Sequence, residues 1–288
     1  MTERGAVRAI ASFALRESLR RRVFVVVALL TVAFLALYGL GTWQLFRTID
    51  ELEQSGVAGV DSGTLAGATL LGLAMFATMF LGTILAVFLT LGAIRGDAER
   101  GLLQPVLVRP VRRRTVLLGR FAAAAGVCGA YVAAVFVAAA VITWAFGGWW
   151  PDRVVVPALQ LAAAVAILAA LSLAGSVFLS STANGIAVFM AFGAGLTAGL
   201  LGQIGEALGS DTLDDVAEGA SWALPFEALY QSALGSITAD TVGFTRLAID
   251  LGPFGGAQSF GPLLWPWVVV YVGLVGVGAA AAFARRDL

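Results

Sequence analysis

Six runs of apolar residues constrain this chain most strongly. A helix needs about 20 apolar residues to cross the hydrocarbon core of a bilayer. We therefore expect membrane-spanning helices at residues 23–41, 69–94, 121–146, 154–179, 185–204 and 263–284. Charged residues make up only 12% of the chain, whereas soluble domains carry roughly a quarter. The sequence predicts an all-α integral membrane protein with a single transmembrane domain over residues 1–288.

The first run follows Arg20, Arg21 and Arg22, as the apolar core of a secretory signal peptide follows its basic segment. Signal peptides, however, have apolar cores of about 7–15 residues that end in a small-residue cleavage site. Residues 23–41 are all uncharged and end in no such site. We therefore expect an uncleaved first span.

Tryptophans mark the ends of two predicted spans. Trp144, Trp149 and Trp150 stand where the third span ends, and Trp265 and Trp267 where the sixth begins. Aromatic residues of this kind are enriched at the membrane–water interface. The tryptophans therefore support these span limits.

The arginines predict the orientation of the chain. Six spans place both termini on one side, and that side receives 15 of the 18 basic residues, leaving Arg47, Arg153 and Arg246 on the other. The acids divide the opposite way, so the two sides carry net charges of +10 and −10. Loops rich in arginine stay in the cytoplasm. We expect a multi-pass protein of the cell (plasma/inner) membrane with cytoplasmic N- and C-termini.

Two stretches outside the spans have helical patterns of their own. Residues 1–22 place apolar residues such as Val7 and Ile10 on one face and arginines on the other, which predicts an amphipathic interfacial helix. The external segment 205–262 contains an acidic stretch and then "LPFEALYQSAL", with Pro225 at a plausible first helical position. We expect two short external helices before the last span.

Absent residue types narrow the chemistry. The chain has no histidine, which excludes Ser–His and H-E-x-x-H catalysis. It also has no lysine, so it cannot form a Walker A loop, which needs a lysine on the phosphates of ATP. We therefore expect no catalytic residues, no metal site and no cofactor in this chain. The single cysteine, Cys128, is expected to be a packing residue.

The connection 95–120 holds seven arginines together with Asp97 and Glu99. One interpretation is a topology anchor whose arginines contact lipid headgroups. Residues 97–104, "DAERGLLQ", however, begin with acids that suit a helix N-terminus and then become apolar, and Pro105 and Pro110 interrupt the remainder of the connection. A short helix of this kind favours a docking element for a cytoplasmic partner.

The same connection resembles the first cytoplasmic loop of type-2 ATP-binding-cassette (ABC) permeases. The matching residues are Glu99, Gly101, Leu102, Leu107, Pro110, Arg112, Leu117, Leu118, Gly119 and Arg120. Leu102 stands where the family often has threonine. The six spans, the basic N-terminal helix and the long segment before the last span extend the resemblance over nearly the whole chain.

The resemblance implies a permease subunit of an ABC transporter, typically an exporter. Two copies of a separate cytoplasmic ATPase would bind ATP and Mg²⁺ and dock beneath it, and a second permease subunit would complete a homodimer or heterodimer. Residues 95–120 would form the coupling segment. We expect its coupling helix to meet the ATPase through Asp97, Glu99, Arg100, Leu102 and Leu103.

A second set of residues is expected to contact inner-leaflet headgroups. These anchors are Arg20, Arg21, Arg22, Arg109, Arg112, Arg113, Arg114 and Arg120. Membrane lipids are therefore expected partners, and nucleic acid is not.

Other functions remain open at this stage. An ATP-independent channel or secondary transporter is the main alternative, although the predicted spans have no Asp, Glu or Arg at their centres. An intramembrane enzyme is less favoured. Gly82, Gly195 and Gly199 fit close helix packing, either within one subunit or at a dimer interface. The sequence identifies no substrate-binding residue; an apolar path favours a lipophilic or amphipathic substrate.

Overall fold

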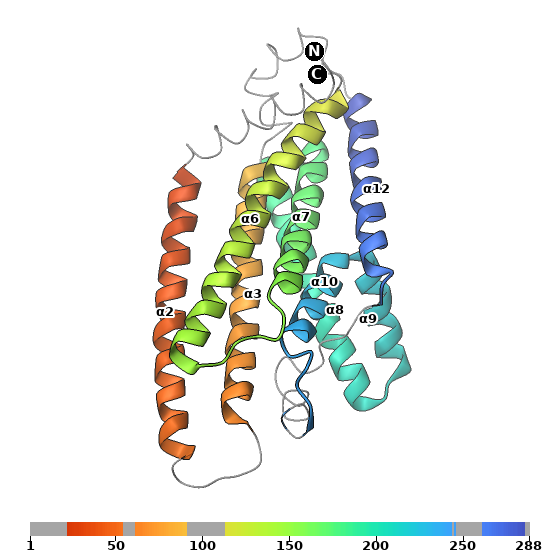
Figure 1. The fold of residues 1–288 in the computed structure, drawn as a ribbon. Helices are drawn as coiled ribbons and strands as arrows, with labels where there is room; N and C mark the ends of the chain where they lie inside the picture. Colours follow the sequence, from red (N-terminus) through yellow and green to blue (C-terminus); the bar gives the residue numbers. More distant parts are fainter. Residues whose placement is uncertain (1–21, 54–60, 91–112, 244, 246–260, 286–288) are drawn as a thin grey trace.

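The computed structural model describes residues 22–53, 61–90, 113–243, 245 and 261–285. Within these residues all regular structure is helical, as predicted, and forms eight helices (Figure 1). They are α2 (Arg22–Glu53), α3 (Ser62–Thr90), α6 (Arg113–Gly147), α7 (Val155–Phe178), α8 (Ser181–Leu208), α9 (Asp211–Ala223), α10 (Pro225–Ile237) and α12 (Leu264–Ala284).

Six of the described helices, namely α2, α3, α6, α7, α8 and α12, are long and apolar enough to cross a membrane. This agrees with the number of predicted spans. Figure 1 shows α3, α6 and α7 side by side, with α2 and α12 at opposite edges. We call the end at which α3 finishes the Thr90 end, and the end at which α6 leads into α7 the Trp150 end.

Several helices are longer than the predicted spans. Helix α2 continues to Glu53 rather than ending at residue 41, and α6 begins at Arg113 rather than at residue 121. Eight residues of the predicted connection 95–120 are therefore helical. Likewise α8 begins at Ser181 rather than at residue 185, and it ends at Leu208 rather than at residue 204. Hydropathy marks only the part of a helix that fits in the bilayer, whereas arginine and glutamate extend a helix readily into water.

The early start of α3, seven residues before the predicted span, has a visible cause. Asp61 precedes the helix, and its Oδ1 accepts a hydrogen bond from the Thr64 backbone N–H at 3.0 Å. Its Oδ2 accepts a second from the Thr64 hydroxyl at 2.6 Å. A side-chain acceptor before the first turn satisfies an otherwise unpaired N–H and fixes the helix start.

Helix α7 forms the centre of the bundle. Leu161, Val165 and Leu168 have no solvent-exposed surface and pack in one cluster with residues of α3, α6 and α10. Gly82 of α3 faces Val132 and Val165 so closely that a Cβ at this position would overlap Val132. The glycine therefore serves packing within this chain. The outward faces of α2 and α12 are instead apolar and exposed.

The two short helices expected between the last two spans are present as α9 and α10, but they differ in burial. Helix α9 exposes Asp211, Asp215 and Glu218. Helix α10 is almost entirely buried and packs mainly against α7, between α8 and α12 (Figure 1). Thus α10 is part of the core of the bundle rather than a helix on its surface.

Candidate functional site

The residues predicted to meet an ATPase lie outside the described part of the chain. They are Asp97, Glu99, Arg100, Leu102 and Leu103. Four of the predicted headgroup anchors also lie outside the described residues, namely Arg20, Arg21, Arg109 and Arg112. Two further anchors, Arg22 and Arg113, begin α2 and α6. Arg114 is exposed on the first turn of α6, and Arg120 is partly exposed two turns later. The structure thus shows the helices that flank the predicted coupling segment.

A buried polar cluster ties one of these flanks to the rest of the bundle. The hydroxyl of Thr90, the last residue of α3, lies 2.6 Å from the hydroxyl of Ser172 on α7 in a hydrogen bond. Asn184, in the first turn of α8, donates from Nδ2 to the Ser172 backbone carbonyl at 2.8 Å. All three residues are buried. The end of α3 is therefore joined to both α7 and α8 where the predicted coupling segment begins.

Gly175 allows this cluster to form. A Cβ at Gly175 would overlap the side-chain oxygen of Asn184. The absence of a side chain on α7 at this position lets Asn184 reach back to Ser172 across the short connection between α7 and α8.

A second buried polar cluster lies on α10. Glu227, the third residue of this helix, is only 2% exposed. Its Oε1 accepts a hydrogen bond from Gln231 Nε2 at 2.9 Å. Among the described residues, Glu227 Oε2, Gln231 Oε1 and the Tyr230 hydroxyl have no hydrogen-bond partner. Three buried polar oxygens are thus left unpaired within one turn of one helix.

Burial controls the ionisation of this cluster. It raises the pKa of Glu227 to about 7, and the hydrogen bond from Gln231 only partly opposes the effect. The pKa of Tyr230 is raised as well, mainly by burial and further by the charge of Glu227. A low-dielectric environment disfavours the charged form of an acid. Glu227 can therefore gain or lose a proton near neutral pH.

Helix α8 closes over Glu227 through two glycines. A Cβ at Gly199 would overlap Glu227 Oε1 and lie 3.0 Å from Gln231 Nε2. Four residues earlier, a Cβ at Gly195 would overlap the ring of Phe226. The sequence left open whether these glycines serve packing within the subunit or a dimer interface. In this structure both serve packing between α8 and α10.

A row of aromatic rings lies next to this cluster. The ring of Phe226 stacks on Phe192 of α8, with centroids 6.1 Å apart and planes inclined by 15°. Phe192 in turn lies 6.0 Å from Phe80 of α3. Phe226 lies against Gly195 and Glu227 against Gly199, four residues further along α8, so an aromatic ring and a carboxyl group both face α8.

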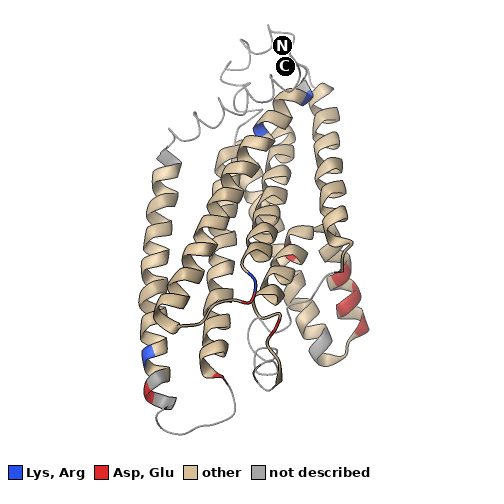
Figure 2. Ribbon diagram, viewed as in Figure 1, with Lys and Arg blue, Asp and Glu red and all other residues tan. Residues whose placement is uncertain are grey.

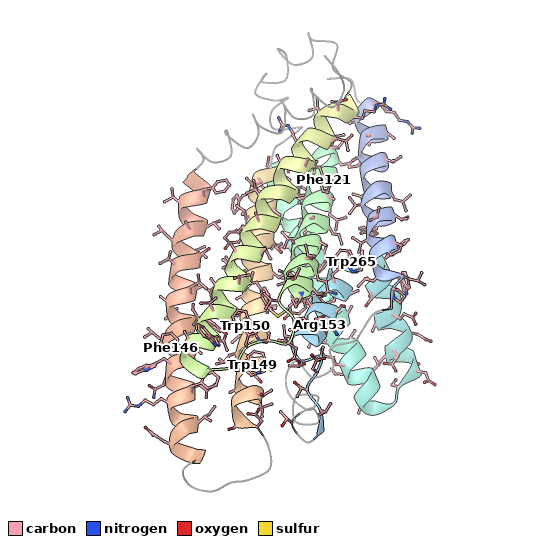
Figure 3. The ribbon with its side chains drawn as sticks, in the orientation of Figure 1. Phe121, Phe146, Trp149, Trp150, Arg153 and Trp265 are labelled. Carbon is pink, nitrogen blue, oxygen red and sulfur yellow. The ribbon has the colours of Figure 1, made fainter. Side chains whose placement is uncertain are left out.

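Tryptophans gather towards the Trp150 end. Trp144 and Trp150 meet edge to face at 6.5 Å, and Trp149 covers Gly67 of α3. Figure 3 shows Trp149 and Trp150 at the connection that leads from α6 to α7. These three tryptophans of the predicted belt therefore lie at one end of the bundle, and the interfacial belt itself stays a prediction.

Sequence reasoning missed Glu227 as a buried group. The distribution of charges counted it among the external acids, where a solvated side chain is the ordinary case. Its local sequence held a signal, however, because Glu227 and Gln231 are four residues apart in the otherwise apolar stretch "LPFEALYQSAL". Polar residues at that spacing face the same side of a helix.

The described residues contain no group of three or more histidine, cysteine, aspartate or glutamate side chains that could hold a metal ion. The buried groups of both clusters are hydroxyls, amides and one carboxyl. Such groups suit hydrogen bonding and recognition of a charged group.

The chain was compared with known protein families. A family model described as "ABC-2 family transporter protein" matches residues 8–288. No match was found among curated proteins. The matched range includes all eight described helices and the connection between α3 and α6.

Proposed function

Because this chain belongs to the ABC-2 family of transporter proteins, we propose that it is the permease subunit of an ATP-driven exporter. It is a multi-pass membrane protein with six candidate spans. A permease domain of this family has no ATPase site of its own, and this chain has no lysine for a Walker A loop. The energy would therefore come from a separate ATPase that binds ATP and Mg²⁺.

The proposed complex contains two ATPase copies and a second permease subunit, either identical or different. The Thr90 end faces the cytoplasm. The described charges support this orientation, because Arg114 and Arg120 lie near the start of α6, and α12 ends next to Arg285, at the Thr90 end (Figure 1). The red acidic segments in Figure 2 lie in the other half, to which Arg47 near the end of α2 and Arg153 before α7 also belong. Arginine-rich ends of spans remain cytoplasmic.

The observation that carries the coupling proposal is the buried link from Thr90 to Ser172 and Asn184. Residues that follow Thr90 form the segment in which Leu102 and Leu103 are proposed to fill a pocket on the ATPase. Since the end of α3 is hydrogen-bonded to Ser172 of α7, which is in turn hydrogen-bonded to Asn184 of α8, a displacement of that segment would move three helices together. This supports residues 95–112 as the element through which ATPase closure acts.

Photo-crosslinking tests this assignment directly. A photoreactive amino acid at Leu102 should crosslink, in native membranes, to a protein that peptide sequencing identifies as bearing a Walker A loop. The same amino acid at Leu30, an exposed apolar position on α2, is the matched control and should not capture that ATPase. Capture of the ATPase from both positions, or from neither, would contradict the proposed docking site.

The reconstituted complex provides a second test. Replacing Leu102 and Leu103 together by serine should leave membrane insertion intact and abolish stimulation of the ATPase by the permease. The control replaces Val106 and Val108 by serine, which removes similar apolar area from the same segment. The permease alone should hydrolyse no ATP.

One observation favours the alternative of a secondary transporter. Buried ionisable groups are what proton-coupled transporters use, and Glu227 is such a group. Transport in proteoliposomes separates the two functions. The ATP-driven exporter requires ATP and its ATPase, whereas transport driven by a pH gradient in the permease alone would establish the alternative.

A further inference from the structure

The described helices that pack against α10 bring no opposite charge to Glu227. Helix α10 packs against α3, α7, α8, α9 and α12, and none of these helices contains a basic residue within its bounds. Their ionisable residues are Glu206 on α8, Asp211, Asp214, Asp215 and Glu218 on α9, and Tyr271 on α12, with none on α3 or α7. Every such group is an acid or a tyrosine. These five helices therefore supply no positive charge to balance an ionised Glu227.

The geometry of the unpaired atoms indicates what would supply that charge. Glu227 Oε2, Gln231 Oε1 and the Tyr230 hydroxyl oxygen can each accept a hydrogen bond, and none has a partner among the described residues. Residues at positions i, i+3 and i+4 share one side of a helix. A protonated amine offers several N–H donors and a single positive charge. A divalent cation would require more carboxylates than the one present.

The neighbouring rings add an apolar contact. Phe226 and Phe192 stack beside the carboxyl group, and Phe80 continues the row. Aromatic faces attract cations and bury the carbon chain attached to them. The combination of one carboxylate, free acceptors and stacked rings fits a molecule that has a cationic head and an apolar body.

We propose that Glu227, Tyr230 and Gln231 bind the ammonium group of an amphiphilic amine, whose apolar part contacts Phe226 and Phe192. This assignment of a substrate class rests on the proposed function as a permease. Gly195 and Gly199 let α8 lie directly on the site, so the structure shows it closed. Separation of α8 from α10 opens it.

Ligand binding to the purified full chain in zwitterionic nanodiscs tests this site. The probe is dodecylammonium, and dodecanol is its neutral counterpart of equal chain length. At about pH 8 the amine is still protonated while Glu227 is ionised. The wild-type chain should bind dodecylammonium about ten-fold or more tightly than dodecanol, as a charge-assisted hydrogen bond implies. Empty nanodiscs correct for partitioning into lipid.

Variants assign the selectivity to the cluster. Glu227→Gln keeps the shape of the side chain and should reduce the preference for the cation to less than about two-fold, whereas Glu218→Gln on the exposed face of α9 should preserve it. Tyr230→Phe should weaken dodecylammonium binding several-fold without changing dodecanol binding. This second variant still tests the site if Glu227→Gln does not fold. Equal binding of dodecylammonium and dodecanol by the wild type would overturn the proposal. Wild-type selectivity in both Glu227→Gln and Tyr230→Phe would overturn it as well.

This experiment separates the new site from the proposed function. It uses the permease without an ATPase, so loss of ATPase coupling in other experiments does not affect its outcome. If binding is selective for the cation and depends on Glu227, but ATP drives no transport by the complex, the amine site is retained and the ATP-driven exporter is rejected. If ATP drives transport but binding shows no selectivity for the cation, the exporter is retained and the amine site is rejected.

Discussion

Glu227 is held where its charged form is costly. A buried carboxylate loses its hydration, and one hydrogen bond from Gln231 does not replace it. The protonated form is stable there and can also donate a hydrogen bond. Burial therefore makes the protonation state of Glu227 depend on pH near neutrality, beside the uncharged side chains of Tyr230 and Gln231 and the apolar ring of Phe226.

The stability of the unliganded protein should fall as pH rises from about 4.5 to about 7. The pKa of Glu227 is raised from 4.5 to about 7 on folding, so the folded state binds more protons than the unfolded state in this range. Stability is then fully present below the lower value and is lost as pH rises through the higher one. The full effect is roughly 3 kcal/mol, and thermal unfolding in nanodiscs measures it.

Replacing Glu227 by glutamine should remove this pH dependence and raise the melting temperature above pH 7. Glu218→Gln is the control, because that carboxyl group is exposed and its replacement should leave the wild-type slope unchanged. A wild-type slope that persists in Glu227→Gln would show that another group is responsible.

Gly199→Ala should destabilise the protein by about 1–3 kcal/mol, because the added methyl group forces α8 away from α10. The carboxyl oxygen that it would meet belongs to a buried side chain with little room to move. Gly193→Ala, on the same helix, is the control, since nothing lies within 4 Å of its Cβ position. Equal melting temperatures for the two variants would contradict the close packing of α8 on α10.

Between elements, the hydroxyl of Ser172 joins three helices. Ser172→Ala removes the hydroxyl that bonds to Thr90 and also accepts from Asn184 Nδ2 at 3.3 Å, and it leaves the backbone carbonyl to which Asn184 donates as well. Loss of these buried hydrogen bonds costs about 1–3 kcal/mol. If the link also transmits motion, the variant should transport less substrate per ATP hydrolysed by the complex. Melting temperature and the ratio of transport to hydrolysis are the two measurements.

Ser176→Ala is the matched control for this link. Ser176 is buried one turn further along α7, but among the described residues its hydroxyl bonds only to the Leu173 carbonyl of its own helix. It should therefore leave the transport ratio unchanged. A ratio that is normal in both variants would mean that the Thr90–Ser172 bond stabilises the bundle without coupling it to the ATPase.

The number and approximate position of the long helices could be predicted because hydropathy reports directly on burial in lipid. Their ends could not. Glu53 lies twelve residues beyond the predicted first span, and Arg113 lies eight before the predicted third. A helix can continue beyond the membrane into water, and arginine and glutamate are good helix formers there. Hydropathy does not detect this continuation, because it measures only how apolar the residues are. The cap formed by Asp61 is likewise a local interaction independent of hydropathy.

The candidate sites could be predicted from the sequence less well than the helices. The Thr90–Ser172–Asn184 cluster joins residues from three helices, and no spacing along the chain reveals such a contact. Glu227 was visible as an acid but not as a buried one, because its burial depends on how α10 inserts beside α7 and α8. The coupling residues, including Leu102 and Leu103, lie outside the described residues and remain predictions from sequence.

For the whole molecule, burial is uneven across the bundle. Helices α3 and α7 are mostly enclosed, whereas α2 and α12 expose apolar residues such as Leu37 and Val269 along much of their length. Apolar surface of this extent is stable against lipid or against another subunit. The proposed second permease subunit would cover part of it, and lipid the remainder.

The orientation of the whole chain is the remaining prediction, and single cysteines can test it. Cys128 is the only cysteine in the sequence, and Cys128→Ala gives a cysteine-free background. Val242 is 80% exposed in the half of the molecule that carries the acids, and Arg285 is exposed where α12 ends. A cysteine at Val242 should react with a membrane-impermeant maleimide on intact cells. One at Arg285 should react only after permeabilisation, because arginine-rich ends stay inside. The cysteine-free protein shows the background labelling, and equal labelling of both positions on intact cells would contradict the net charges of +10 and −10 assigned to the two sides.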